Sequence, residues 1–259
     1  MKPILQFDDV SLNFGNLHVL RSLSFRIWPG ELVSVLGPSG CGKTSMLNII
    51  AGFQQPTSGV ALVDGREIVG PGPDRGVVFQ SYALFDWMTV AENIAFSLRC
   101  AGKSRSEQRL VAKRMMELVG LEGFAKAYPY QLSGGMRQRC GLARVLAANP
   151  KVMLMDEPFA AVDVQTRELL QEEILRIQAE THCTIVFITH SIDEAVFLGN
   201  RIFLMDATEP SGYAEFEVHL PQPRYQGENR LHDDFVRTRQ EVYRRMRSAR
   251  KTNQPTETS

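Results

Sequence analysis

The stretch of sequence that decides the fold is Gly37-Pro38-Ser39-Gly40-Cys41-Gly42-Lys43-Thr44, which matches the pattern GxxxxGK[ST]. It follows an apolar run at residues 31–36 that predicts a strand, and residues 45–51 can continue as a helix. Glycines let the backbone wind tightly, so that successive N–H groups converge on one point, and the helix directs its positive end there. The stretch therefore predicts a phosphate cradle. The alternative is a glycine-rich turn that carries a lysine by chance, and the flanking strand and helix disfavour it.

Four side chains of the expected cradle region supply chemistry. Lys43 adds a positive charge for the β and γ phosphates of a nucleotide, and Thr44 offers a hydroxyl to Mg²⁺. Asp156 and Glu157 end the apolar run at residues 152–155. Asp156 can reach the metal held by Thr44, and Glu157 can orient and deprotonate an attacking water. Taken alone, this acidic pair is equally a solvated turn after a strand, but the cradle upstream favours the catalytic interpretation.

The rest of the chain predicts an α/β fold. Near-continuous apolar runs, typical of strands buried on both faces of a parallel sheet, occur at residues 31–36, 76–79, 152–155 and 184–189. Apolar and polar residues alternate at 23–27, as in a half-buried strand. Capping boxes beginning at Thr89 and Ser104 predict helices within residues 87–150, and Ser191 begins another helix that ends near Gly199. We therefore expect a parallel core interrupted by a helical insertion.

A second anion-binding helix terminus is predicted at Gln131-Leu132-Ser133-Gly134-Gly135-Met136-Arg137-Gln138-Arg139. Ser133 occupies an N-cap position, and the two glycines expose backbone N–H groups at the start of a helix. The alternative is a serine-capped core helix with a glycine pair. The full string resembles the signature motif of ATP-binding cassette (ABC) proteins, which is the most specific motif of that family. The resemblance covers about residues 4–220.

The ABC resemblance implies roles for further residues. Phe14 stands where the family places an aromatic ring that stacks on adenine, although a lone Phe in a strand is more often a core residue. Gln80 matches the Q-loop glutamine, and His190 matches the switch histidine that contacts the γ-phosphate. Residues 160–163 resemble the D-loop, with Val162 where leucine is more usual and Asp163 at its end.

The candidate site implied by the motifs and the resemblance is therefore large. Its catalytic members are Glu157, His190 and Lys43; its ATP-binding members are Phe14, Gly37, Pro38, Ser39, Gly40, Cys41, Gly42, Lys43, Thr44, Ser45 and Gln80; its signature members, acting on the ATP of a second subunit, are Leu132, Ser133, Gly134, Gly135 and Gln138; its D-loop member is Asp163; and its Mg²⁺ ligands are Thr44, Gln80 and Asp156. The implied cofactors are ATP and Mg²⁺.

The resemblance also implies an architecture. We expect a P-loop NTPase (RecA-like) core with an N-terminal antiparallel β subdomain and an inserted helical signature subdomain. The core would comprise residues 1–86 and 151–220, and the helical subdomain residues 87–150. Residues 221–259 would form a C-terminal linker, a basic helix from Asp233 to about Arg250, and a disordered tail.

Composition limits the function classes. The chain has 259 residues, and its 29 Lys and Arg balance its 29 Asp and Glu, so charge gives no general attraction to nucleic acid. The four cysteines show no metal-binding or paired spacing, which is typical of reduced thiols. No apolar run is long enough for a membrane helix, and the first residues lack the apolar core of a signal peptide. We therefore expect a soluble protein that acts on a membrane only through a partner.

Three stretches resemble the nitrate/sulfonate/taurine importer branch of the ABC family: residues 70–80, 87–94 and 190–198. Asp86 departs from the branch, which usually has proline there, in the region that meets the permease. The resemblance implies an ATPase that drives uptake of a small anionic or zwitterionic solute. Its partners would be a membrane permease, indirectly an extracytoplasmic binding protein, and a second copy of this chain, with no nucleic acid. It would lie on the cytoplasmic face of a bacterial inner membrane.

Other functions remain open at this stage. A soluble ABC ATPase acting on DNA or ribosomes is disfavoured because long insertions or a second cassette are missing from the sequence. An exporter ATPase is disfavoured only by the branch resemblance. A non-catalytic binding module is disfavoured because Lys43, Asp156, Glu157 and His190 are all present. The basic C-terminal helix is expected to pack on the domain as a solvated helix, and the alternative is contact with a partner subunit or anionic lipid.

Overall fold

The computed structural model describes residues 2–79, 83–160, 162–206, 209 and 211–252. A six-stranded sheet forms its centre, with the order β10-β9-β3-β8-β7-β6. Its strands are β3 (Leu32–Leu36), β6 (Arg75–Val78), β7 (Val152–Asp156), β8 (Thr184–Thr189), β9 (Arg201–Met205) and β10 (Tyr213–Glu217). All neighbours pair in parallel except β10, which lies antiparallel on β9 at the edge. Every residue of β3 and β8 is buried, which confirms the predicted parallel sheet covered on both faces.

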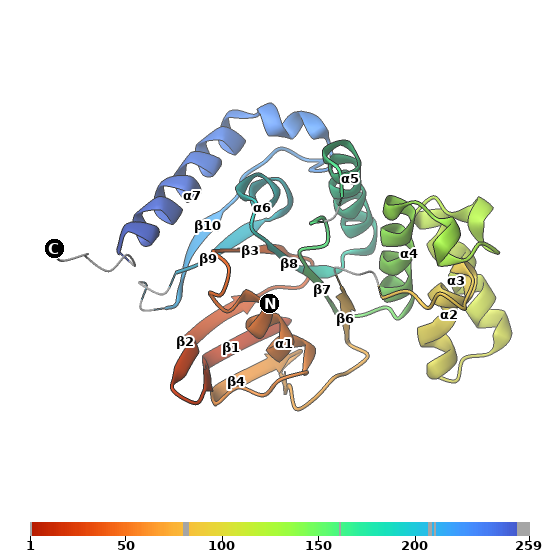
Figure 1. Cartoon of the computed structure of the whole chain (residues 1–259), viewed down its shortest axis with the longest axis horizontal. Helices are drawn as coiled ribbons and strands as arrows, with labels where there is room; N and C mark the ends of the chain where they lie inside the picture. Colours follow the sequence, from red (N-terminus) through yellow and green to blue (C-terminus); the bar gives the residue numbers. More distant parts are fainter. Residues whose placement is uncertain (1, 80–82, 161, 207–208, 210, 253–259) are drawn as a thin grey trace.

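A second, antiparallel sheet has the order β2-β1-β4-β5. It contains β1 (Leu5–Phe14), β2 (Leu17–Ile27), β4 (Ser58–Val63) and β5 (Arg66–Glu67). Buried and accessible residues largely alternate along β1, so one face of this sheet packs inward. Helix α1 (Lys43–Ala51) lies between the sheets, and its Met46 and Ile50 share one core cluster with Phe7 of β1 and Val35 of β3. This packing fixes the start of α1, and so the end of the loop before it, relative to both sheets. Figure 1 shows α1 among the strands of the antiparallel sheet.

Helices α2 (Val90–Cys100), α3 (Arg105–Leu118) and α4 (Gly134–Ala147) form a cluster beyond β6, at the right of Figure 1. The capping boxes predicted at Thr89 and Ser104 are both formed. Short 3₁₀ turns at Glu122–Phe124 (η1) and Pro129–Gln131 (η2) connect α3 to α4. The apolar faces of these helices share one core cluster with the central sheet, so the start of α4 has a fixed position relative to the strands.

The remaining helices are α5 (Val164–Thr181), α6 (Ile192–Leu198) and α7 (Asp233–Thr252), with a 3₁₀ turn η3 at Gly227–Leu231. Helix α7 lies along α6 on the side of the molecule away from α2 and α3 (Figure 1). Phe235 and Val242 of α7 are buried in the same core cluster as α6. A disordered tail was predicted from Thr252 to Ser259. Thr252 is instead the last residue of α7, and residues 253–259 lie outside the described residues.

The segment between β10 and α7, which the sequence suggested as a linker, packs against the domain. The Arg224 guanidinium is buried and donates hydrogen bonds to the carbonyl oxygens of Val196 and Phe197, at the end of α6. Burial lowers the pKa of Arg224 to about 10. The Asn229 side chain donates to the carbonyl oxygens of Pro221, Pro223 and Arg224, which closes the segment into a compact loop.

None of the helices in the described part of the chain combines the length and apolarity that crossing a bilayer requires.

Candidate active site

Three neighbouring parallel strands end at one edge of the central sheet, and each end carries a candidate site residue. In the pairing register Leu36 of β3 lies beside Thr189 of β8, and Asp156 of β7 lies beside Ile188 of β8. The phosphate-cradle loop follows β3, Glu157 follows β7, and His190 follows β8. Strand order therefore brings together three segments that are far apart in the sequence, at the edge where open α/β sheets bind ligands.

The loop from Gly37 to Gly42 leads directly into α1, so the predicted strand–loop–helix context is present. Gly42 is the N-cap of α1 at φ +96°, a conformation that favours glycine. A Cβ atom at Gly42 would lie 2.5 Å from the Cδ2 atom of Leu20 and 2.9 Å from the carbonyl oxygen of Val19. Only glycine can lie this close to β2. The antiparallel sheet therefore helps to fix the position of the N-terminus of α1.

The Lys43 side chain is buried, 6% exposed, within this loop. Its ammonium nitrogen donates to the carbonyl oxygens of Gly37 and Pro38, at 2.8 Å each. The charge is therefore held on the concave side of the loop, where backbone N–H groups and the start of α1 favour an anion. Cys41 lies beside Lys43, with its sulfur 3.9 Å from the ammonium nitrogen, and burial raises the pKa of the Cys41 thiol.

The Thr44 hydroxyl donates to Oδ2 of Asp156 at 3.2 Å, across 112 residues of sequence. Burial raises the pKa of Asp156, and the neighbouring Glu157 carboxylate adds to that rise. A hydroxyl and a carboxylate oxygen side by side are the hard ligands that Mg²⁺ prefers. Within the described residues no three His, Cys, Asp or Glu side chains gather around one point. The pair thus fits a cation that takes its other ligands from a substrate and from water.

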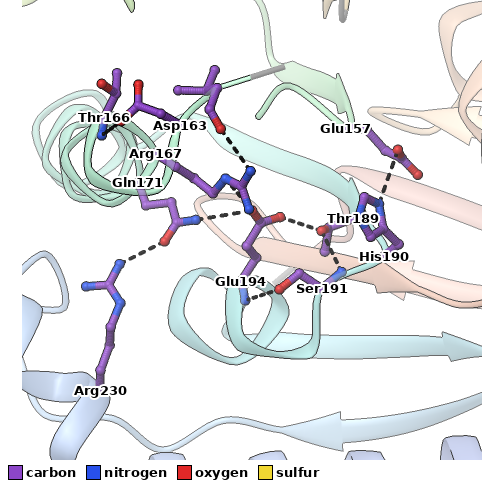
Figure 2. Close-up of polar contacts among 11 residues, drawn as sticks. Glu157, Asp163, Thr166, Arg167, Gln171, Thr189, His190, Ser191, Glu194 and Arg230 are labelled. Atoms are coloured by element: carbon purple, nitrogen blue, oxygen red, sulfur yellow. Dashed lines mark hydrogen bonds and ion pairs between the residues drawn. The ribbon is translucent and has the colours of Figure 1, made fainter. Parts of the chain in front are cut away.

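Glu157 and His190 form the second contact of the site. The Nδ1 atom of His190 lies 3.3 Å from Oε2 of Glu157 (Figure 2). Glu157 has φ +45°, a conformation that costs about 1–3 kcal/mol for a residue with a Cβ atom. Its backbone N–H donates to the carbonyl oxygen of Ile188 at 3.0 Å, which holds the residue in this conformation beside β8. The carboxylate is thereby directed from the end of β7 toward the end of β8.

Two predicted nucleotide contacts lie further out. Phe14 ends β1, and its ring is 54% exposed, although most large side chains of that strand are buried. The exposed ring at the end of β1 is available for stacking, and its contact with a nucleotide base remains a prediction. Gln80, predicted as a Q-loop contact and a Mg²⁺ ligand, lies outside the described residues.

The signature residues surround the start of α4. Ser133 is the N-cap, and its hydroxyl accepts a hydrogen bond from the N–H of Met136, as predicted. A Cβ atom at Gly134 would meet nothing within 4 Å, so this side of the helix terminus is open. Leu132 and Gln138 are buried and anchor the turn.

The signature turn opens on a pocket of its own. Ser133 and Gly135 line a pocket of about 470 Å³ together with Thr166 and Glu173 of α5, and none of the described cradle residues lines it. Asp163 is the N-cap of α5 and accepts from the N–H of Thr166 at 3.0 Å, which lowers the pKa of Asp163. The signature turn and the D-loop aspartate therefore lie near each other at the starts of α4 and α5.

Sequence reasoning did not find the polar residues behind His190. Glu194, Gln171 and Arg167 gather there, with Arg230 reaching in from the C-terminal segment (Figure 2). Glu194 lies in the helix start after Ser191 and in the stretch 190–198 that resembles the importer branch, but neither pattern indicated its contacts, and the other three residues carried no sequence signal. Their partners lie in other elements, so only the fold brings them together.

The fold and the site together define a P-loop nucleoside triphosphatase: a parallel sheet whose strand ends bring a phosphate loop, an acidic pair and a histidine to one edge. A family model described as ABC transporter matches residues 20–160. The chain is 45% identical over 229 residues to the taurine import ATP-binding protein of Pelagibacter ubique, covering 87% of this chain and 86% of that protein. It is 44% identical over 218 residues to the nitrate import ATP-binding protein of a Synechocystis strain, covering 84% of this chain and 82% of that protein.

One solved structure agrees in fold. It is cbiO1 of Clostridium perfringens, part of the ABC transporter complex cbiONQ, with a TM-score of 0.78, 23% identity, and coverage of 98% of this chain and 100% of that one. The chain belongs to the ABC transporter family, which confirms the resemblance seen in the motifs. It binds ATP and is a transport ATPase.

Proposed function

We propose that this chain is the ATP-hydrolysing subunit of an ABC importer for a small anionic or zwitterionic solute of the taurine, alkanesulfonate or nitrate class. The taurine and nitrate import proteins named above support the importer and the class of cargo. The ATPase does not touch the cargo, so its residues carry cargo information only through ancestry. Soluble and exporter ABC ATPases are the alternatives that the experiment below distinguishes.

The main support for ATP hydrolysis by this chain is that three strands end at one edge of the central sheet. There Lys43 lies in the loop, Thr44 contacts Asp156, and Glu157 contacts His190. In the proposed mechanism the loop N–H groups, Lys43 and Ser45 bind the phosphates, and Phe14 stacks on the base. Glu157 orients the attacking water and accepts its proton, while His190 donates to the γ-phosphate oxygens. The positions of Lys43, Glu157 and His190 at this edge support their proposed roles.

Thr44 and Asp156, with Gln80, would hold Mg²⁺. When bound, the ion would supply positive charge to the β and γ phosphate oxygens. The raised pKa of Asp156 fits this role, since a cation would favour the ionised carboxylate that burial disfavours. Thr44 and Asp156 would thus fix the position of the Mg²⁺ charge. Glu157 would accept the proton released in hydrolysis.

A second copy of the chain completes the site in this proposal. Ser133, Gly134 and Gly135 would bind the ATP held by the other subunit, because the pocket they open onto is separate from the cradle of their own chain. ATP then joins two subunits, hydrolysis releases them, and the motion passes to a membrane permease. Residues 1–86 and 151–220 would form the ATP-binding core and residues 87–150 the signature subdomain. The assembly would lie on the cytoplasmic face of the cell membrane, with an extracytoplasmic binding protein as an indirect partner.

The experiment is a tagged pull-down from detergent-solubilised membranes of the native host, with mass spectrometry of the bound proteins. Recovery of a multi-span permease and a binding protein supports the importer, and titration of that binding protein with taurine, alkanesulfonates and nitrate then identifies the cargo. Recovery of ribosomal or DNA-bound proteins alone overturns the transport role while leaving the ATPase intact. A permease without any binding protein favours the exporter.

A further inference from the structure

A buried polar network lies behind the proposed switch histidine. Its centre is Glu194 of α6, which is only 8% exposed. One carboxylate oxygen accepts from the Thr189 hydroxyl. The other accepts from the Gln171 amide at 3.3 Å and lies 3.8 Å from Nε of Arg167 (Figure 2). Burial raises the pKa of Glu194, and the hydrogen bond from Thr189 and the charge of Arg167 oppose that rise. A buried carboxylate held by two hydrogen bonds and an ion pair has a single preferred position.

Glu194 fixes the turn that carries His190. Its partner Thr189 immediately precedes the histidine, and the Thr189 hydroxyl also accepts from the N–H of Ser191 at 3.0 Å. The Ser191 hydroxyl in turn accepts from the N–H of Glu194 at 3.4 Å. Both neighbours of His190 are therefore tied to Glu194. The imidazole itself is exposed and lies beside the Glu157 carboxylate, so its direction depends on this turn.

The network continues into the C-terminal segment. The Gln171 amide that donates to Glu194 accepts, through its oxygen, a hydrogen bond of 2.8 Å from the Arg230 guanidinium. Because the Gln171 amide has one donor end and one acceptor end, this bond orients it toward Glu194. Arg230 also lies 3.5 Å from the centroid of the Phe197 ring of α6. The C-terminal segment thus contacts the helix after the switch histidine and the residue that supports Glu194.

Other residues of this segment also pack against α6. The buried Arg224 binds the last carbonyl oxygens of α6, where a cation is also favoured by the helix dipole. Phe235 and Val242 of α7 enter the core beside the same helix. Displacing the segment would therefore remove Arg230 together with the contacts that fix α6.

We propose that residues 221–252 position His190 through Arg230, Gln171 and Glu194, so that docking of the C-terminal segment sets the rate of ATP hydrolysis. This inference rests on the proposed role of His190. Arg230, Gln171 and Glu194 act on His190 through the turn that carries it and are positioning residues. ATP binding depends on the loop before α1, which the network does not contact, so loss of positioning lowers kcat and leaves KM for ATP unchanged.

The test compares purified full-length Arg230→Ala, Arg230→Lys and Arg237→Ala with the unchanged chain. Arg237 is the matched control, since it lies on α7 and pairs with Asp234 of the same helix. Arg230→Ala is expected to lower kcat about fivefold at unchanged KM. Arg230→Lys is expected to keep more than half of the kcat of the unchanged chain, because lysine keeps a charged donor for Gln171. Arg237→Ala is expected to match the unchanged chain.

A spectroscopic readout separates positioning from general stability. The chain has five histidines, so the imidazole signals of ¹⁵N-histidine-labelled protein can be assigned, with His190→Gln identifying the switch residue. Arg230→Ala is expected to move the His190 signal and leave those of His18 and His219 in place. An unmoved His190 signal, or a kcat equal to that of Arg237→Ala, overturns the inference.

Two further variants cover the remaining outcomes. If Arg230→Ala unfolds, the same readouts are taken on Glu194→Gln, which preserves volume and removes the charge; normal kcat there also overturns the inference. His190→Ala distinguishes failure of the proposed role of His190 from failure of the positioning inference. If it hydrolyses ATP normally, the proposed role of His190 fails. If it loses turnover while Arg230→Ala and Glu194→Gln keep theirs, only the positioning inference fails.

Discussion

At the scale of single residues, Lys43 is placed by backbone contacts within its own loop. The carbonyl oxygens of Gly37 and Pro38 both accept from its ammonium group, which holds the charge within the loop proposed to bind phosphate. Truncating the side chain removes the charge and leaves the backbone N–H groups in place. Lys43 is therefore a residue whose loss should affect chemistry much more than folding.

We expect Lys43→Ala to lower ATP hydrolysis by more than about 10²-fold, because a positioned cation stabilises charge that develops on the transferred phosphoryl group. Phosphate release at saturating ATP measures the effect. Lys113→Ala, which removes an exposed lysine paired with Glu117 on α3, is the matched control and should hydrolyse normally. Retained turnover in Lys43→Ala would show that the phosphate-loop assignment is wrong.

Glu157 is the residue proposed to accept the proton of the attacking water. Glu157→Gln preserves shape but cannot act as a base, so hydrolysis should fall by about 10²–10⁴-fold while ATP still binds. Because hydrolysis would separate the ATP-joined subunits, the variant should accumulate as a dimer with ATP, which light scattering measures. Glu168→Gln, on the exposed side of α5, is the control. Hydrolysis at the unchanged rate in Glu157→Gln would mean that another base acts.

At the scale of elements, the helices beyond β6 begin at side-chain caps that fix their starts. In the capping box of α2 the Glu92 carboxylate accepts from the backbone N–H of Thr89 at 2.8 Å and from its hydroxyl at 2.9 Å. The N–H of Glu92 donates to the Thr89 hydroxyl in return. These bonds lower the pKa of Glu92. The start of α2 is thus specified by four consecutive residues.

Thr89→Ala should lower the free energy of unfolding by about 1 kcal/mol at pH 7, the usual effect of losing an N-cap side chain. Thermal denaturation should show a drop in Tm of about 2–4 °C for a chain of this size. Thr89→Ser, which keeps the hydroxyl, should differ little from the unchanged chain. An equal drop in both variants would indicate that packing of the threonine methyl group, and not the cap, is responsible.

The same cap predicts a pH dependence. The folded pKa of Glu92 lies below its unfolded value, about 4.3, so its contribution is complete above that value. It is lost as pH falls through the folded pKa, because the protonated carboxyl accepts these bonds poorly. The difference in stability between Thr89→Ala and the unchanged chain should therefore shrink in acid. A difference that stays constant from pH 7 to pH 4 and below would contradict this.

At the scale of the whole molecule, the signature turn and the phosphate loop of one chain lie at separate sites. The turn at Ser133 opens on the pocket shared with α5, and the loop lies at the strand ends of the central sheet. Two subunits placed head to tail would bring one copy of each to a shared ATP. In the proposed mechanism a complete site therefore requires a dimer, although each chain carries every motif.

Ser133→Arg should leave ATP binding to the monomer intact and block formation of the ATP-bound dimer, because a long cation replaces the cap at the subunit interface. Equilibrium nucleotide binding and light scattering measure the two properties. Ser104→Arg removes the N-cap of α3 in the same way but outside the signature, and it controls for loss of a cap. Loss of monomer binding in Ser133→Arg alone would mean that the signature is not used by a second subunit.

Much of the site was predictable because its motifs are short and contiguous. The cradle from Gly37 to Thr44, the acidic pair after β7 and the cap at Ser133 each lie within a few residues, and local backbone geometry specifies them. The strand predicted at residues 184–189 coincides with β8, since a run buried on both faces is a strong local signal. The division into domains and the roles of the individual site residues stay predictions until the variants above are measured.

Local sequence patterns specify the phosphate loop, the family and the starts of α2, α3, α4 and α6, because hydrogen bonds within a few residues and hydrophobic periodicity encode them. Contacts between distant residues depend on the tertiary structure. Gln171 and Arg230 are 59 residues apart, and Thr189 and Glu194 lie close in sequence but bond only because α6 turns back against β8. Such contacts depend on strand order and helix packing, which are set by the whole core, and no local pattern of residues specifies them.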